Sequence, residues 1–318
     1  MSLLKTRVFN VALLLVITVM MPVVINAQAP MSEIKLGGDV LAGGEQGEAT
    51  SGPEAVAFDG TYIWIASQFK NTVTRIRVSD SSVAGTFSVC KRPVALLHAA
   101  SSVWIACLLD NNVTKLDPAN GAVQATYTAG DGPGGLAFDG TNLWIANRNS
   151  NDVTKLNATT GANLGTFPVG RRPISLTVAG GSVYVANNMG NSVTHLSTAG
   201  AVVGTYQVGK GPFGVAVQGE FLWVSNFFGK SLTKLRASDG VNLGTFKVGD
   251  GAAGIAADAN SLWVVVSGEN SLVKVDPSTG SVVTTYATGK GPFSVVLGGG
   301  NAYVPNFASD SVSVTAAN

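Results

Sequence analysis

The sequence is poor in the side chains on which most catalytic and metal sites depend. Its 318 residues include two histidines and two cysteines, and only 12% of them are charged. It has no EF-hand loop, no paired-histidine or Cys-x-x-Cys cluster, and no Gly-x-Ser-x-Gly or P-loop motif. We therefore expect no metal ion, no cofactor and no nucleophilic centre, and we favour a protein without catalytic activity.

Charge of either sign is also scarce. The formal net charge is +1, which argues against a global attraction to nucleic acid or to an acidic membrane surface. An electrostatic preference for a partner must then come from charges that cluster locally.

The only long hydrophobic run stands at the start of the chain. Lys5 and Arg7 precede apolar residues 8–24, and a small residue, Ala27, follows a short polar step. This order is typical of a secretory signal peptide over residues 1–27. An uncleaved anchor is the alternative, because the run approaches the roughly 18 to 20 apolar residues that span a bilayer. We expect an exported protein, periplasmic, secreted or on the cell surface, with no membrane segment after cleavage.

The remainder, residues 28–318, is dominated by repetition. A proline recurs about every 40 residues, with one alanine in its place, at Pro53, Pro93, Pro133, Pro173, Pro212, Ala252 and Pro292. The units start near residues 52, 92, 132, 172, 211, 251 and 291. Large rings recur in the same frame at Trp64, Trp104, Trp144, Tyr184, Trp223, Trp263 and Tyr303. A period of this length predicts one all-β domain, a seven-bladed β-propeller.

Each unit contains four short apolar runs separated by turn residues, so we expect blades of four antiparallel strands, a to d from the axis outward. In the third unit the runs are residues 135–138, 143–147, 153–156 and 163–169. A second ring recurs in strand d, at Phe87, Tyr127, Phe167, Tyr206, Phe246 and Tyr286. We expect both sets of rings to pack in the core.

Closure of the ring requires the N-terminal segment. The last unit ends after three strands, so residues 32–50 are expected to supply the fourth strand of that blade. The apolar candidates are Ile34, Leu36, Val40 and Leu41. A strict count from Pro53 puts Gly47 in the slot of the strand-d ring, so an insertion or a different strand is needed. Deletion of residues 28–45 should lower the melting temperature sharply.

Several segments resemble a known repeat. They are Val183-Tyr184-Val185-Ala186-Asn187, Gly190-Asn191-Ser192-Val193-Thr194 and Gly211-Pro212-Phe213-Gly214-Val215. They resemble the YVTN-type propeller repeat of bacterial and archaeal surface proteins and the YncE-like family, from residue 52 to the C-terminus. Cys107, Val266 and Ala252 depart from the pattern. The resemblance implies the propeller fold but no single activity, because that superfamily includes surface-layer, binding and enzymatic members.

The two histidines fall in repeated slots. His195 occupies the strand-c slot that the other units fill with Arg75, Lys115, Lys155, Lys234 and Lys274, and His98 occupies an apolar strand-a slot. We interpret both as structural. Virginiamycin B lyase is similar in being a seven-bladed propeller, but the histidine, glutamate and magnesium constellation of that family has no match here.

The two cysteines are expected to meet. Cys90 lies in the connector that enters strand a of the second unit, and Cys107 ends strand b of the same unit. Because these strands are antiparallel, both sulfurs lie at one edge of one blade. An exported protein can then form a disulfide there, with two buried free thiols as the alternative.

The remaining candidate is a surface. The connectors between units and the turns between strands b and c emerge on one face of a propeller, around the channel. The connectors carry Lys91, Arg92, Arg171, Arg172, Lys210 and Lys290 against two acidic residues, and Arg148 lies in a neighbouring turn. Phe213 and Phe293 follow their prolines opposite Glu54. We predict a monomeric binding module for an anionic small molecule or for an exported or surface protein.

Two alternatives remain open for this face. A lyase or lactonase-like hydrolase would work in the central funnel, with Glu54 as its acid or base. Single-stranded nucleic acid would place phosphates on the basic rim and stack its bases on phenylalanines. Export and the low net charge weaken the second alternative.

Overall fold

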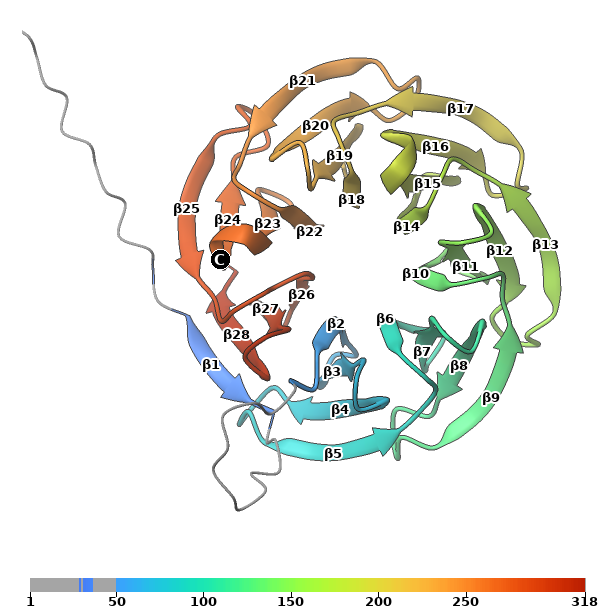
Figure 1. Ribbon diagram of the computed structural model, residues 1–318, viewed down its shortest axis with the longest axis vertical. Helices are drawn as coiled ribbons and strands as arrows, with labels where there is room; N and C mark the ends of the chain where they lie inside the picture. The colour runs from blue at the N-terminus through green and yellow to red at the C-terminus, as the bar shows by residue number, and fades with distance from the viewer. Residues whose placement is uncertain (1–28, 30, 37–49, 318) are drawn as a thin grey trace, which may run out of the picture.

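Seven sheets radiate from a central axis in the computed structural model, which describes residues 29, 31–36 and 50–317 (Figure 1). Each sheet has four antiparallel strands, and successive sheets follow one another around the ring. The fold is a seven-bladed β-propeller, as the repeat predicts. The expected signal peptide, residues 1–27, lies outside the described residues. No helix in the described ranges is long and apolar enough to cross a membrane.

The strands of the blades, from the axis outward, have the following bounds. Blade 1 comprises β2 (Pro53–Phe58), β3 (Tyr62–Ser67), β4 (Thr72–Arg77) and β5 (Val83–Ser88), and blade 2 comprises β6 (Pro93–Ala99), β7 (Ser102–Cys107), β8 (Asn112–Leu116) and β9 (Val123–Thr128). Blade 3 comprises β10 (Pro133–Phe138), β11 (Asn142–Asn147), β12 (Asp152–Asn157) and β13 (Asn163–Pro168), and blade 4 comprises β14 (Pro173–Ala179), β15 (Ser182–Asn187), β16 (Ser192–Ser197) and β17 (Val202–Gln207). Blade 5 comprises β18 (Pro212–Gln218), β19 (Phe221–Asn226), β20 (Ser231–Arg236) and β21 (Asn242–Lys247), and blade 6 comprises β22 (Ala252–Ala257), β23 (Leu262–Val266), β24 (Ser271–Val275) and β25 (Val282–Ala287). Blade 7 comprises β26 (Val296–Gly298), β27 (Asn301–Asn306), β28 (Ser311–Ala316) and the N-terminal β1 (Ser32–Lys35), and two 3-10 turns, η1 (Asn188–Gly190) and η2 (Ser267–Glu269), lie between strands b and c of blades 4 and 6.

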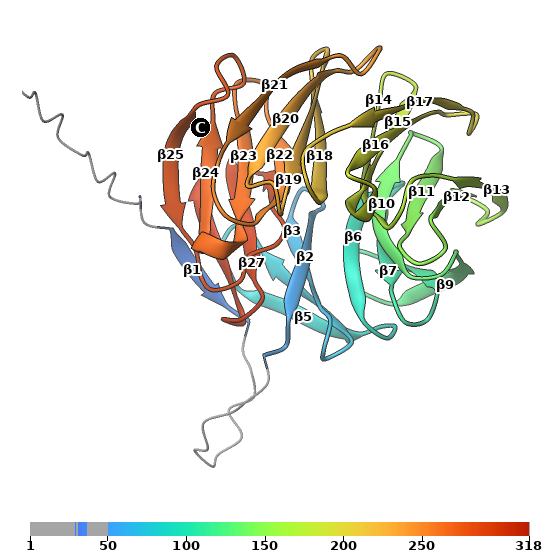
Figure 2. The same cartoon turned by 45° about the horizontal axis from the view of Figure 1, so that its top comes forward.

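The expected strand bounds agree with these to within one or two residues. In blade 3, strand a starts at its proline, two residues earlier than expected, because a bulge after Pro133 keeps that residue opposite Asn147. Figure 2 shows the innermost strands running side by side around the axis, for example β2 beside β6 and β18 beside β22.

Both sets of large rings pack in the core. All five tryptophans are fully buried, and each blade-core tryptophan of blades 1, 2, 3, 5 and 6 lies 5.7 to 5.9 Å from the strand-d ring of its own blade. The strand-c cation covers the same tryptophan, as Lys155 Nζ does at 5.0 Å from the Trp144 ring. Lys155 Nζ also donates to the carbonyl of Thr198 in the next blade at 2.7 Å. The slot thus joins neighbouring blades.

A second link joins the blades on the face that carries the connectors. An asparagine with left-handed backbone ends the turn between strands b and c in five blades, at Asn71, Asn111, Asn151, Asn191 and Asn270. Its Oδ1 accepts a hydrogen bond from a backbone N–H of the next connector, at 2.7 to 2.9 Å. Asparagine suits this position because it tolerates positive φ and offers a short acceptor.

The ring closes through the N-terminus. Strand β1 pairs antiparallel with β28 and sets Ile34 opposite Val312, the register in which Phe167 faces Val153 in blade 3. Ile34 therefore holds the slot in which a strict count put Gly47. Asp310 adds a second closing contact, because its Oδ1 accepts from the backbone N–H of Ser51 at 2.7 Å. The other expected closing residues, Val40, Leu41 and Gly47, lie outside the described residues.

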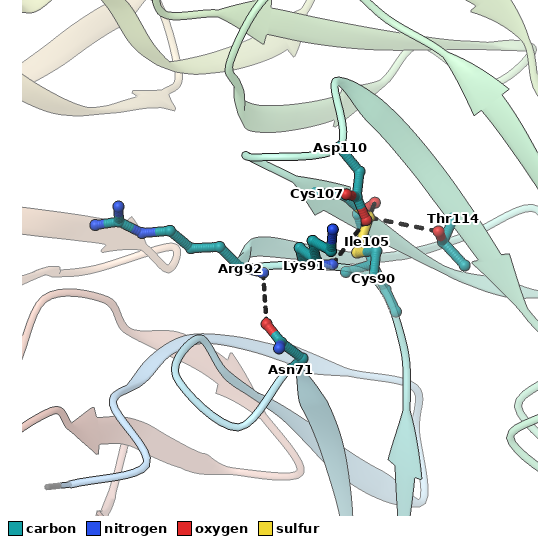
Figure 3. Close-up of a disulfide and its surroundings, with 8 residues drawn as sticks. All are labelled: Asn71, Cys90, Lys91, Arg92, Ile105, Cys107, Asp110 and Thr114. Atoms are coloured by element: carbon teal, nitrogen blue, oxygen red, sulfur yellow. Dashed lines mark hydrogen bonds between the residues drawn. A yellow bond between two sulfur atoms is a disulfide. The ribbon is translucent and has the colours of Figure 1, made fainter.

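A disulfide joins Cys90 and Cys107, with Cα atoms 5.7 Å apart, at the entrance of blade 2 (Figure 3). Four other blades hold an asparagine at the end of strand b with a glycine against it, as in the pairs Asn147–Gly130 and Asn187–Gly170. The disulfide thus occupies the site that an asparagine and a glycine fill elsewhere in the ring.

Candidate functional site

The connectors and the turns between strands b and c form one face, because backbone hydrogen bonds tie them together. Arg148 N donates to Gly132 O at 2.8 Å in blade 3, and Phe227 N donates to Gly211 O at 2.8 Å in blade 5. At the centre of this face, a cavity of about 190 Å³ on the axis is lined by strand a of blades 1 to 6 and by residues 293–295, which precede strand a of blade 7. A second cavity of about 180 Å³ adjoins it, and we call the two together the channel mouth.

The residue after the repeated proline shapes the channel mouth. Because strand a runs along the axis, its first residues stand around the entrance. This position holds Glu54, Val94, Gly134, Ile174, Phe213, Ala253 and Phe293 in blades 1 to 7. The repeat keeps the backbone constant here but varies the side chain in charge and volume, so the mouth differs from one side to the other.

One side is aromatic. Six rings, which we call the phenylalanine arc, form a chain of contacts with centroid separations of 5.3 to 6.5 Å: Phe69, Phe307, Phe293, Phe213, Phe227 and Phe228. They come from blades 1, 5 and 7. The terminal rings reach solvent, since Phe228 is 67% exposed and Phe69 is 55% exposed. Exposed aromatic surface of this extent beside a cavity is typical of a binding site.

The facing side is cationic, and its central group is Arg148. Gly134 leaves open the space at the entrance that other blades fill with a side chain, and a Cβ atom on Gly134 would overlap the Arg148 Nε atom. Arg148 Nη2 donates to Gly134 O at 3.3 Å. Its Nε is buried, and no hydrogen-bond acceptor lies against it in the described part of the chain. Arg148 lines both cavities of the channel mouth, so a ligand in the mouth can meet its guanidinium group.

Three further arginines surround Arg148. Arg172 lines the channel mouth, and Arg171 and Arg172 line an open cavity of about 350 Å³ beside it together with Arg148. Arg92 approaches from blade 2, where its Nε donates to Gln68 Oε1 at 2.7 Å. Figure 3 shows the Arg92 side chain extended away from the disulfide. We call Arg92, Arg148, Arg171 and Arg172 the arginine arc.

Glu54 lies between the two arcs and lines both cavities. Burial raises the pKa of Glu54, and the charges of Arg148 and Arg92 oppose that rise. Burial likewise lowers the pKa of Arg148, and the Glu54 charge opposes the change. Among the described residues, no ion pair joins Glu54 directly to an arginine. The carboxyl group can therefore change its protonation state without breaking a salt bridge.

The candidate residues from the sequence divide into two groups. The structure brings together Glu54, Phe213, Phe293 and the four arginines around the channel mouth. Lys91, Lys210 and Lys290 are exposed on their connectors and line none of these three cavities. Their backbone groups bond to the neighbouring turns instead, as Lys91 N does to Asp110 Oδ2 at 2.8 Å.

Sequence reasoning missed two features of this site. It did not consider Gly134, although a glycine in a slot that holds side chains in the other blades is a signal of close approach. It also did not indicate that Phe69, Phe227, Phe228 and Phe307, which lie in the turns between strands b and c, join Phe213 and Phe293 in one aromatic cluster. A search of the described residues finds no group of three or more histidine, cysteine, aspartate or glutamate side chains that could hold a metal ion.

Comparison with solved structures finds the same fold in proteins of distant sequence. Hydrazine synthase of Kuenenia stuttgartiensis superposes with a TM-score of 0.77 at 17% identity, covering 88% of this chain and 99% of that chain. A streptogramin B lyase superposes with a TM-score of 0.77 at 16% identity, over 90% of this chain and 97% of the other. The virginiamycin B lyase of Staphylococcus aureus gives 0.76 at 16% identity, over 90% and 98%.

The shared property is the propeller. At these identities the likeness establishes the fold and not the chemistry. No family model matches the chain, and no curated protein matches it. The YVTN-type and YncE-like resemblance therefore stays a prediction.

Proposed function

We propose that the protein is an exported binding module that takes an anionic ligand with an apolar part at the channel mouth. The observation that carries this proposal is the Arg148 guanidinium, which lines the same cavity as four rings of the phenylalanine arc, Phe213, Phe227, Phe228 and Phe293. A carboxylate, sulfonate or phosphate group on Arg148 gains charge-assisted hydrogen bonds. The apolar part of the same molecule covers aromatic surface that water otherwise contacts.

A matched pair of dyes tests the proposal. 1-Anilinonaphthalene-8-sulfonate and N-phenyl-1-naphthylamine share an aromatic skeleton, but only the first carries an anionic group. We expect the sulfonate to bind more tightly, with fluorescence titration as the measurement. Arg148→Gln should weaken the sulfonate at least tenfold, because a hydrogen bond to a charged group contributes about 1.5–3 kcal/mol.

Two further variants separate the halves of the site. Phe213→Ala should weaken both dyes, whereas Arg148→Gln should leave the neutral dye nearly unchanged. Lys91→Gln is the matched control, since Lys91 is exposed outside the three cavities. If Lys91→Gln weakens the sulfonate as strongly as Arg148→Gln does, the connectors attract anions without a built site and the proposal fails.

The second candidate is an enzyme, a lyase or lactonase-like hydrolase. The observation in its favour is Glu54, a buried carboxyl group with a raised pKa that lines the cavity on the axis. A raised pKa lets a carboxyl group hold a proton at a higher pH than an ordinary glutamate does, which suits a general acid or base. Turnover of lactone or cyclic-peptide substrates that disappears in Glu54→Gln would favour this function, and a protein that binds such substrates unchanged would exclude it.

We also propose that the protein is exported. This part of the proposal rests on the N-terminal sequence alone. A basic start, an apolar run and a small-residue step precede the described part of the chain. N-terminal sequencing of protein recovered from outside the cytoplasm should start at Gln28. Recovery only from the cytoplasm with Met1 retained would contradict it.

A further inference from the structure

Blade 4 departs from the repeat at two neighbouring slots far from the channel mouth. Its strand-b ring is Tyr184 instead of tryptophan, and its strand-c slot holds His195 instead of lysine or arginine. These two residues face each other in the sheet, with ring centroids 4.6 Å apart and the rings stacked. They lie toward the hairpin between strands a and b, whereas the channel mouth is at the other end of β15.

In blades 1, 2, 3 and 5 the strand-c cation has a structural role. It reaches across the gap between blades and donates to a carbonyl of the next blade's c-to-d turn, as Lys115 does to Ala158 O at 3.3 Å and Lys234 does to Pro277 O at 2.9 Å. The equivalent carbonyl for blade 4 is that of Ala237. There the Tyr184 hydroxyl donates to it at 2.9 Å.

Because Tyr184 makes this contact, His195 is not needed for the hydrogen bond to the next blade. Its shorter side chain stays within blade 4, and an open cavity of about 430 Å³ lies between blades 4 and 5 beside it. The lining includes Ser182, Tyr184, His195, Glu220, Ala237 and Ser238. The His195 residue itself is only 5% exposed, so its ring forms the floor of this cavity.

The imidazole is held between two hydroxyl groups. His195 Nε2 lies 2.8 Å from Ser182 Oγ, and His195 Nδ1 lies 3.0 Å from the Tyr206 hydroxyl. In the tautomer with the proton on Nδ1, Nδ1–H donates to Tyr206 and Nε2 accepts from Ser182. That arrangement has the order nucleophile, base and orienting group that activates a serine in unrelated folds.

Burial also favours the neutral ring. It lowers the pKa of His195, and burial raises the pKa of Tyr206, so both groups are uncharged at neutral pH. The other titratable groups near the ring are Tyr184 on β15 and Glu220 in the hairpin that follows β18. A neutral imidazole is the form that can take the proton of a serine.

We propose that Ser182 is an activated nucleophile, with His195 as its general base and Tyr206 as the residue that positions the imidazole, and that it reacts with small activated esters and phosphonyl fluorides. The proposal is independent of ligand binding at the channel mouth. Ser182 is partly exposed and lines the cavity, which gives such reagents access.

The reaction is a substitution at carbon or phosphorus. With 4-nitrophenyl acetate, a bond forms between Ser182 Oγ and the carbonyl carbon, the bond from that carbon to the aryl oxygen breaks, and 4-nitrophenolate leaves. The serine proton passes to His195 Nε2 and then to water. With a phosphonyl fluoride, the same oxygen bonds to phosphorus and fluoride leaves, which makes the product permanent.

The repeat supplies its own controls. Ser102 and Ser261 occupy the equivalent hairpin position in blades 2 and 6, where the strand-c slot holds Lys115 and Lys274. Treatment of the full-length mature protein with a fluorophosphonate should label Ser182, with peptide mapping by mass spectrometry as the measurement. We expect the labelling rate at Ser182 to exceed that at either control serine by about 100-fold, the lower range for a general base.

His195→Lys is the decisive variant, because it restores the residue that the repeat uses and should fold. It should reduce labelling of Ser182 about 100-fold while leaving the melting temperature unchanged or higher. The labelling rate of the unaltered protein should rise with pH and level off below the ordinary histidine pKa of about 6.5. Tyr206→Phe should shift that profile.

Three results would overturn the proposal. They are no labelling of Ser182, labelling at the rate of Ser102 or Ser261, and labelling that survives His195→Lys. The first two mean that the oxygen is unreactive, because Ser102 and Ser261 are buried, and the third means that it is an ordinary exposed hydroxyl group.

Discussion

Replacement of the disulfide by the pair that the repeat uses elsewhere tests the account of blade 2 most directly. Cys90 and Cys107 stand where blade 3 has Gly130 and Asn147. Two double variants are compared: Cys90→Ala with Cys107→Ala, which leaves the site empty, and Cys90→Gly with Cys107→Asn, which restores the pattern of the other blades.

The cost of removing the bond follows from its loop. With a sequence separation of 17, the chain-entropy model gives about 3 kcal/mol at 25 °C. At about 2–4 °C per kcal/mol, near the lower value for a domain of this size, the alanine variant should melt about 6 °C lower. The alanine variant also loses the contact between Cys107 Sγ and Thr114 Oγ1, which lie 3.4 Å apart.

The second variant should recover part of that loss. In blade 3 the Asn147 amide donates to Thr154 Oγ1 at 2.9 Å and to Asp152 Oδ1 at 2.6 Å. Blade 2 already has the matching partners in Thr114 and Asn112, and Asn112 Oδ1 is buried with no partner among the described residues. Two hydrogen bonds contribute about 0.5–1.5 kcal/mol each, less about 0.5–1 kcal/mol for the flexibility of the new glycine.

Chemical unfolding of the three proteins in oxidising and reducing buffer measures these differences. The glycine and asparagine variant should be about 1–2 kcal/mol more stable than the alanine variant, and neither should respond to reductant. Equal stability of the two variants would refute the reasoning, because it would mean that the disulfide site is not equivalent to the asparagine sites.

Three shorter predictions concern the channel mouth and the ring. Gly134→Ala should displace the Arg148 side chain and weaken anionic dye binding with little change in stability. Gly135→Ala should destabilise the fold, because a Cβ atom there would lie 2.8 Å from a backbone oxygen of blade 4. Equal effects of the two variants on stability would contradict this prediction. Burial raises the pKa of Glu54, so this carboxyl group becomes protonated as the pH falls through that raised value and loses the negative charge beside Arg148. Affinity for the sulfonate dye should therefore rise from pH 7 to pH 5. In Glu54→Gln the affinity should be independent of pH. A pH response that persists in that variant would assign it to another group. Asp310→Ala should lower the free energy of unfolding by about 1–3 kcal/mol, since it leaves a closing N–H unpaired, and no loss would mean that strand β1 alone closes the ring.

The fold could be predicted because each unit repeats the same residue pattern. The proline, the strand-b ring and the strand-d ring recur at a fixed spacing, so a strand that is ambiguous in one unit can be assigned from the other units. The closing strand has no such support. Its register depends on how residues 37–49 are accommodated, and a count backwards from Pro53 cannot supply that, so Ile34 takes the slot instead of Gly47.

The candidate site was predictable in composition but not in geometry. The sequence showed an excess of basic residues on the connectors, yet it could not show which of them line a cavity. Arg171 and Arg172 do so beside Arg148, whereas Arg92, Lys91, Lys210 and Lys290 line none of the three cavities. That distinction depends on the register between neighbouring blades. The approach of Arg148 to Gly134 joins the turn after strand b of one blade to its strand a, and only the folded sheet brings them together.

The departures from the repeat have different physical meanings, and the structure separates them by what each one leaves unpaired or open. Cys107 departs from asparagine but fills its site with a disulfide, so the change is compensated within the blade. Gly134 departs by losing a side chain, and the released volume admits the Arg148 guanidinium, which lines the channel mouth. His195 departs by losing reach, and a tyrosine makes the lost contact while a cavity lies beside the imidazole. A compensated departure conserves the interior, whereas one that places a charged or titratable side chain on a cavity makes that side chain available to a ligand. On this criterion blades 3 and 4, rather than blade 2, are where ligands should be sought.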